Sequence, residues 1–114
     1  AWFITSTQGL SVAGKYKSGT QVFPNGDDVY LQTNVFESAT KEIKTYSDGE
    51  LKATLTLETD PEGGNTDDLF IGKRDDSNPL AWAGDLFELI IYNTALSDSD
   101  RVQVEQYLRD KYGL

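Results

Sequence analysis

Residues 85–114 read "DLFELIIYNTALSDSDRVQVEQYLRDKYGL", and this stretch contains the strongest fold signals in the chain. Its first part, together with Trp82 just before it, is rich in the β-branched and aromatic residues that favour strands. From Leu86 to Tyr92 both alternating sets of positions are apolar. We therefore predict a central strand at residues 82–92 that is covered on both faces, by a second sheet and by a helix or other element.

The rest of this stretch has the features of an amphipathic helix. Ser97 suits the N-cap, and Gly113 suits the position after the last turn. Acids in the first turn and bases in the last turn match the helix dipole; these residues are Asp98, Asp100, Arg109 and Lys111. We expect the apolar stripe of the helix to dock on the sheet; it consists of Val104, Tyr107, Leu108 and Tyr112.

The first half of the chain alternates with a period of two, which is typical of strands with one buried face. The alternation predicts an antiparallel meander of three strands, and Asp48 and Gly49 form the turn between the last two. These strands are expected at residues 29–36, 41–46 and 51–57, with Leu51, Ala53, Leu55 and Leu57 on one side. Further strands are expected at residues 2–8, 15–23 and 69–74, and an acidic loop at residues 58–68.

Length and charge limit the function. A chain of 114 residues is the size of one domain, and nothing in its composition marks a domain boundary. The 19 acidic and 10 basic residues give a net charge of −9, which disfavours nucleic acid and anionic membrane surfaces as partners. Without cysteine or histidine, thiolate or imidazole zinc sites and histidine-dependent catalytic pairs are excluded.

Three motifs carry a family resemblance: "LFIG" at residues 69–72, "AGDLFELIIYNTALSDSD" at residues 83–100 and "VEQYLRDKYGL" at residues 104–114. Together they resemble the C-terminal part of a laminin-G-like domain of the concanavalin A-like lectin and glucanase superfamily. The resemblance is specific over residues 69–114 and extends in outline over residues 2–114. It implies a mostly β fold, an antiparallel β-sandwich of the jelly-roll type, with one C-terminal α-helix.

Members of that family are longer, so we expect residues 1–114 to be a single domain that forms the C-terminal part of a larger one. A strand that is apolar on both faces then needs cover from elsewhere. The expected partners are a missing N-terminal part, a second copy of this chain or a neighbouring subunit, so that the chain is not a stable isolated monomer. The alternative is a shortened sandwich that closes with its own strands.

Asp85 and Glu88 are the candidates for paired catalytic carboxylates, because related glycoside hydrolases keep two acids on one strand. Residues three apart on an unbulged strand point to opposite faces, which argues against such a pair. Glu88 is instead expected to be a paired structural carboxylate, and no catalytic residue is predicted.

The resemblance also leaves Ca²⁺ open, since laminin-G-like domains often hold one at a rim of the sandwich through oxygen ligands. The candidate ligands are Asp27, Asp28, Asp75 and Asp76, with Asn78 nearby. Solvated turn acids are the competing interpretation, and no other cofactor is predicted.

Glycan binding requires exposed aromatic rings that stack on sugars. Tyr16, Trp82 and Tyr46 are the candidates, and core packing is the competing interpretation for Trp82. We therefore predict a non-catalytic, extracellular or virion-surface recognition and adhesion module that binds a glycan or a protein. The alternatives are a structural assembly domain without a small ligand and, least favoured, a glycoside hydrolase.

Overall fold

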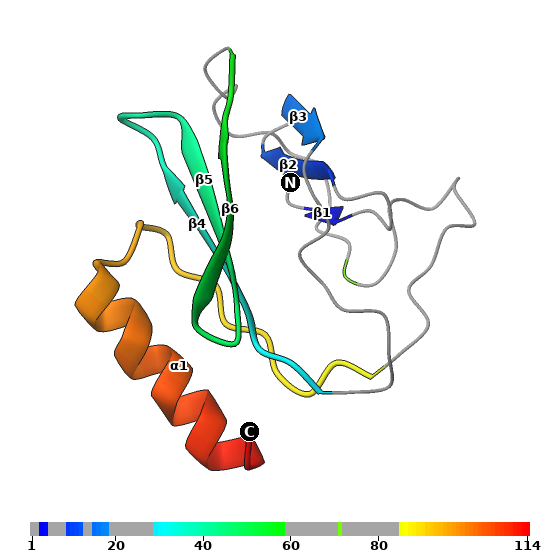
Figure 1. The fold of residues 1–114 in the computed structure, drawn as a ribbon, viewed down its shortest axis with the longest axis vertical. Helices are drawn as coiled ribbons and strands as arrows, with labels where there is room; N and C mark the ends of the chain where they lie inside the picture. The colour runs from blue at the N-terminus through cyan, green and yellow to red at the C-terminus, as the bar shows by residue number, and fades with distance from the viewer. Residues whose placement is uncertain (1–2, 5–8, 13–14, 19–28, 59–70, 72–84) are drawn as a thin grey trace.

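The computed structural model describes residues 3–4, 9–12, 15–18, 29–58, 71 and 85–114 (Figure 1). In this part of the chain two antiparallel three-stranded sheets precede one helix. The first sheet has the order β1-β2-β3 and consists of Phe3–Ile4, Gly9–Val12 and Lys15–Ser18. The second has the order β4-β5-β6 and consists of Gln32–Glu37, Glu42–Ser47 and Glu50–Thr56.

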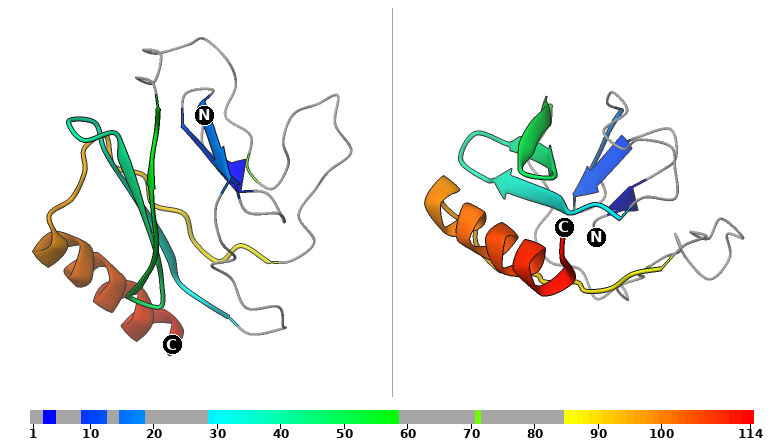
Figure 2. Two further views of the ribbon diagram at one scale, coloured as in Figure 1. Left: turned by 45° about the horizontal axis from the view of Figure 1, so that its top comes forward. Right: turned by 60° about the horizontal axis from the view of Figure 1, so that its bottom comes forward.

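The helix α1, Asp98–Tyr112, lies on one side of the sheet β4-β5-β6, and the sheet β1-β2-β3 lies on the other side (Figures 1 and 2). This arrangement of helix, sheet and sheet confirms the predicted mostly β, antiparallel fold with a C-terminal helix. The N-terminal sheet differs from the prediction in one respect. Strand β2 occupies residues 9–12, between the strands predicted at residues 2–8 and 15–23.

The predicted meander is confirmed in β4, β5 and β6, which pair in sequence order. The turn between β5 and β6 places both Asp48 and Gly49 at positive φ, 52° and 83°. This is the conformation that the right-handed twist of a two-residue hairpin requires, and glycine adopts it without steric cost. The side chain of Asp48 also contacts the residue before β4: its carboxylate accepts a hydrogen bond from the Leu31 amide at 3.0 Å.

One detail of the meander is wrong in the prediction. The register shifts by one residue between β5 and β6, so that Tyr46 pairs with Leu51 while Thr45 pairs with Ala53. A single extra residue in one strand reverses the face of every residue beyond it. Leu51 therefore does not share a face with Ala53 and Leu55, and it is exposed.

The core of the described residues is small. Ile43 is fully buried and Leu57 nearly so, with Phe36 and Leu55 packed against them. Asn34 and Thr45 lie on the same face of the sheet, where the Asn34 amide oxygen accepts from the Thr45 hydroxyl at 2.9 Å. The free-energy cost of burying these two polar side chains is small because they form a hydrogen bond with each other.

The ends of α1 confirm the prediction. The Ser97 hydroxyl accepts from the Asp100 amide at 3.1 Å, and Gly113 closes the helix in the left-handed conformation, with its N–H bonded to the Arg109 carbonyl oxygen. The buried face differs from the predicted stripe. Tyr107 is exposed, whereas Arg101 and Glu105 are buried. Hydrophobic periodicity does not detect such positions, because a charged pair that neutralises itself can face a sheet as an apolar residue does.

The prediction of a strand at residues 82–92 is wrong for residues 85–92, which pair with none of the described strands and are extended coil. The expected cover on both faces is not found for these residues either. Leu86, Phe87, Leu89, Ile90, Ile91 and Tyr92 are all exposed. A strand requires a neighbour that exchanges backbone hydrogen bonds, and the sequence pattern reports only the tendency to form one.

Candidate functional site

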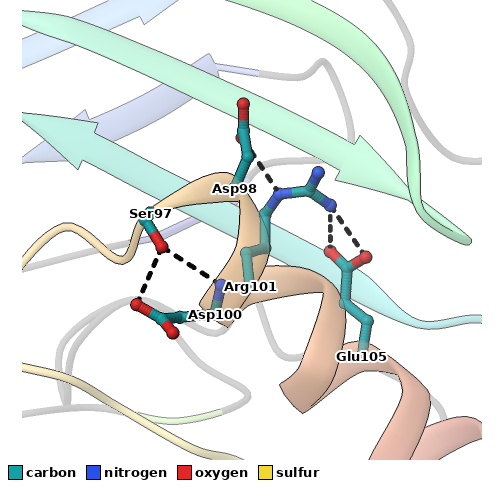
Figure 3. A network of polar contacts seen from close by, with 5 residues as sticks. All are labelled: Ser97, Asp98, Asp100, Arg101 and Glu105. Atoms are coloured by element: carbon teal, nitrogen blue, oxygen red, sulfur yellow. Dashed lines mark hydrogen bonds and ion pairs between the residues drawn. The ribbon is translucent and has the colours of Figure 1, made fainter.

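A polar network links side chains in the first turns of α1 (Figure 3), and through Arg101 it also contacts the sheet. The Arg101 guanidinium donates from Nη1 to both carboxylate oxygens of Glu105 at 2.8 Å, and Nε lies 3.6 Å from the Asp98 carboxylate. Both spacings along the helix, three and four residues, bring side chains to the same face. On its other side the guanidinium lies over the ring of Tyr46, 3.8 Å from the centroid.

The surroundings of Arg101 keep it charged. Desolvation of the side chain alone would lower its pKa, but the hydrogen bonds and charge of Glu105 outweigh it and raise the pKa overall. Within the described residues, Nε of Arg101 is a buried side-chain nitrogen without a hydrogen bond. The network is therefore a structural contact between helix and sheet, in which the charge of Arg101 is paired with those of Glu105 and Asp98.

A second cluster joins residues 85–92 to the last turn of α1. One carboxylate oxygen of Glu88 accepts from Lys111 Nζ at 2.9 Å and from the Tyr112 hydroxyl at 2.8 Å. The Tyr112 ring stacks on Phe87 with centroids 5.7 Å apart. The expectation that Glu88 is a paired structural carboxylate agrees with these contacts, while Asp85, three residues earlier, is exposed.

The titration of this cluster follows from its hydrogen bonds. The bonds from Lys111 and then from Tyr112 lower the pKa of Glu88. The same contacts raise the pKa of Lys111 and the pKa of Tyr112, because both protonated groups donate to the carboxylate. Glu88 is therefore ionised at neutral pH, which suits an anchoring acceptor and does not suit a general acid.

The apolar segment, defined as residues 86–92, is the largest run of exposed hydrophobic side chains in the described part of the chain. It runs beside α1 on the same side of the sheet β4-β5-β6 (Figure 2). Three aromatic rings of this region are open to solvent: Phe87, Tyr92 and Tyr107. The sequence pattern assigns these rings to the core, and no periodicity signal distinguishes an exposed apolar run from a buried one.

Of the three predicted ligand-binding residues, the structure describes the side chain of Tyr46. Tyr16 lies in β3, where its backbone is opposite Ser11. Trp82 lies outside the described residues. Tyr46 is 7% exposed, and Arg101 covers its ring. Stacking of a sugar on Tyr46 would require the helix to move, and the ligand role of the three residues stays a prediction.

The predicted metal ligands Asp27, Asp28, Asp75 and Asp76 also lie outside the described residues. Within the residues that the structure does describe, no group of three or more acidic side chains is placed to hold a metal ion. Ca²⁺ binding therefore stays a prediction. In the same part of the chain, no helix is both long and apolar enough to cross a membrane.

A family model described as the concanavalin A-like lectin/glucanases superfamily, Laminin_G_3, matches residues 4–100. The chain belongs to this superfamily, which confirms the resemblance seen in its motifs. No curated protein and no solved structure gives a significant match. Membership supports a carbohydrate- or protein-binding module in general terms, because these are the ligands that laminin-G-like domains bind.

The extent of the match corrects one expectation. The motifs place the specific resemblance at residues 69–114, as a C-terminal part of the family domain, whereas the match begins at residue 4. It also ends at residue 100, so most of α1 lies beyond it. Alternation in short strands is a weaker signal than a motif such as "GDLFELIIYN", and for this reason the N-terminal half resembles the family only in outline.

Proposed function

We propose that this chain is a non-catalytic recognition and adhesion module of an extracellular or virion-surface protein, with a glycan or a protein as its ligand. The observation that carries the proposal is the superfamily match over residues 4–100. Fold alone does not assign a ligand or a reaction, so the choice between binding and catalysis depends on the acidic side chains.

The state of Glu88 supports binding over catalysis. A retaining glycosidase needs two carboxyl groups about 5 Å apart, one of which carries a proton at working pH. Glu88 is instead held by Lys111 and Tyr112, which lower its pKa. These contacts help to hold the apolar segment against α1, which gives the carboxylate a structural role.

Glycan-array binding by the purified chain tests the proposal. Tyr16→Ala and Trp82→Ala are expected to abolish any glycan signal without changing the thermal melt. Tyr107→Ala removes an exposed aromatic ring on α1, the same ring as in Tyr16, and it serves as the matched control. If the control abolishes binding and the other two do not, the ligand lies on the helix side. Cleavage of a β-glucan by the purified chain would overturn the non-enzymatic assignment.

Calcium is a separate part of the proposal. A ligand present at about 100 times its Kd stabilises a protein by about 2.7 kcal/mol, which a thermal melt resolves. Two double variants test the loops: Asp27→Asn together with Asp28→Asn, and Asp75→Asn together with Asp76→Asn. The double variant in the loop that binds Ca²⁺ should lose the Ca²⁺-dependent shift in melting temperature. An unchanged melt in millimolar Ca²⁺ would remove the metal from the proposal.

The second candidate function is a structural assembly domain without a small ligand. The apolar segment favours it, because contiguous exposed hydrophobic surface commonly marks a protein interface. A chain that binds no glycan or separate protein but assembles through this segment would have this second function.

A further inference from the structure

We propose that residues 86–92 pair with the same residues of a second copy of this chain, as an antiparallel two-stranded ladder centred on Leu89. The segment has the composition of a strand, contains no proline or glycine, and pairs with none of the described strands. The inference concerns assembly and does not rest on the recognition function.

The sequence of the segment is compatible with pairing to itself. With Leu89 opposite its own copy, Phe87 faces Ile91 and Leu86 faces Tyr92, so that aromatic residues meet aliphatic ones. Such cross-strand pairs stabilise a sheet by about 0.2–1 kcal/mol each. The one charged residue, Glu88, faces Ile90, and the two acids of a dimer are not directly opposite each other. This register therefore avoids a like-charge contact.

Contacts within the chain favour the same register. Besides Glu88, the Tyr112 hydroxyl lies 3.4 Å from the carbonyl oxygen of Phe87, so the backbone of Phe87 faces α1. In a strand, residues two apart direct their backbone polar groups to the same edge, so Leu89 and Ile91 would share that orientation. The backbone N–H and C=O groups of Glu88 and Ile90 then face the free edge. There Glu88 of one copy and Ile90 of the other form a hydrogen-bonded pair. Leu89 becomes the central pair without hydrogen bonds.

The exposed area suits a weak dimer. Six apolar side chains are each about half exposed, and a large side chain has an area on the order of 200 Å². The segment thus presents on the order of 600 Å² per copy, or about 1,200 Å² for two, at the lower limit of specific interfaces. An area at this limit is typical of weak, reversible association, and packing and charge, not area alone, set the affinity.

The net charge of −9 opposes association of two copies, so the salt dependence of the dimer can distinguish this interface from one held by ion pairs. Repulsion between two acidic copies is screened as the Debye length falls from about 10 Å at 0.1 M salt to about 3 Å at 1 M. Salt should therefore strengthen this dimer, whereas it would weaken an assembly held by ion pairs.

Sedimentation of the purified chain provides the first test. We expect a monomer–dimer equilibrium at about micromolar concentration that tightens with salt, and Leu89→Asp should weaken it by about tenfold or more by placing two carboxylates opposite each other. Val102→Asp, at an equally exposed apolar position on α1, is the matched control and should leave the dimer intact.

Cysteine cross-linking tests the register, because the chain has no cysteine of its own. Leu89→Cys should form a disulfide dimer rapidly, since a central pair of this kind places its Cα atoms about 4.5 Å apart, within the range for a disulfide. A mixture of Leu86→Cys and Tyr92→Cys should form the mixed dimer in preference to either homodimer. Val102→Cys should cross-link slowly.

Two results would overturn the proposal. One is a monomer that shows no association at high salt, with amides of residues 86–92 protected from hydrogen exchange, since the chain would then cover its own segment. The other is a dimer in which Leu89→Cys cross-links no faster than Val102→Cys, since the contact would then lie elsewhere.

Discussion

The guanidinium of Arg101 lies 3.8 Å from the ring centroid of Tyr46 and joins the first turns of α1 to strand β5. Glu105 holds the same guanidinium by two hydrogen bonds of 2.8 Å. The contact between helix and sheet therefore consists of a charged pair stacked on an aromatic ring, an arrangement that is stable only while both charges are present.

Removing one member of this pair should destabilise the fold. Arg101→Met keeps much of the apolar stem but leaves the buried Glu105 carboxylate without its cation, at an expected cost of about 1–3 kcal/mol in the free energy of unfolding. The double variant Arg101→Met with Glu105→Leu should recover most of that loss, because no unpaired charge remains. Urea denaturation measures both. Equal stability of the single variant and the original chain would contradict the contact.

The helix cap can be tested separately. Ser97→Ala removes the acceptor for the Asp100 amide and should lower the free energy of unfolding by about 0.5–2 kcal/mol. Ser99→Ala, two residues later and exposed inside the first turn, is the matched control and should have little effect. Thermal melts of both variants suffice, and a larger loss for Ser99→Ala would place the cap at a different residue.

The hairpin turn should resist substitution. Gly49 has φ of +83°, and an added Cβ would lie 3.4 Å from Nη2 of Arg109. Gly49→Ala should therefore destabilise by about 1–2 kcal/mol, mainly through the left-handed backbone. Gly49→Asn should cost less, because asparagine tolerates this conformation. The order of the two melting temperatures is the measurement, and a more stable alanine variant would exclude the turn geometry.

The pH dependence of stability should report on Glu88. Hydrogen bonds from Lys111 and Tyr112 lower its pKa in the folded state below the ordinary value of 4.5. A lowered carboxylate pKa stabilises the fold above the unfolded-state pKa, and this contribution is lost as pH falls through the folded-state pKa. Glu88→Gln should therefore lose stability relative to the original chain at neutral pH, and the difference should shrink in acid.

At alkaline pH the stability of the fold should change in the opposite direction, falling as pH rises. The pKa values of Lys111 and Tyr112 are raised, so their contribution is present below the ordinary values of 10.5 and 10.0 and is lost as pH rises further. Unfolding curves measured across the acid range for the original chain, Glu88→Gln and the exposed control Asp85→Asn test the acid limb. A difference that does not change with pH would mean that Glu88 is unpaired.

The sequence by itself determined the features that local chemistry controls. Asp48 and Gly49 specify a turn because they tolerate positive φ, and Ser97 and Gly113 delimit the helix because they satisfy its end groups. Alternation located β4, β5 and β6, and the motifs were sufficient to identify the superfamily. Each of these signals lies within a few residues of the feature that it predicts.

Tertiary structure alone decided which surfaces are covered. The register shift at Tyr46 turned Leu51 outward, and a neutralised pair, Arg101 with Glu105, took the buried face of the helix. Residues 86–92 are apolar in sequence yet exposed, because burial depends on a neighbouring surface and strand formation depends on a partner's backbone. These are properties of contacts between distant segments or chains, and a local pattern of residues does not contain them.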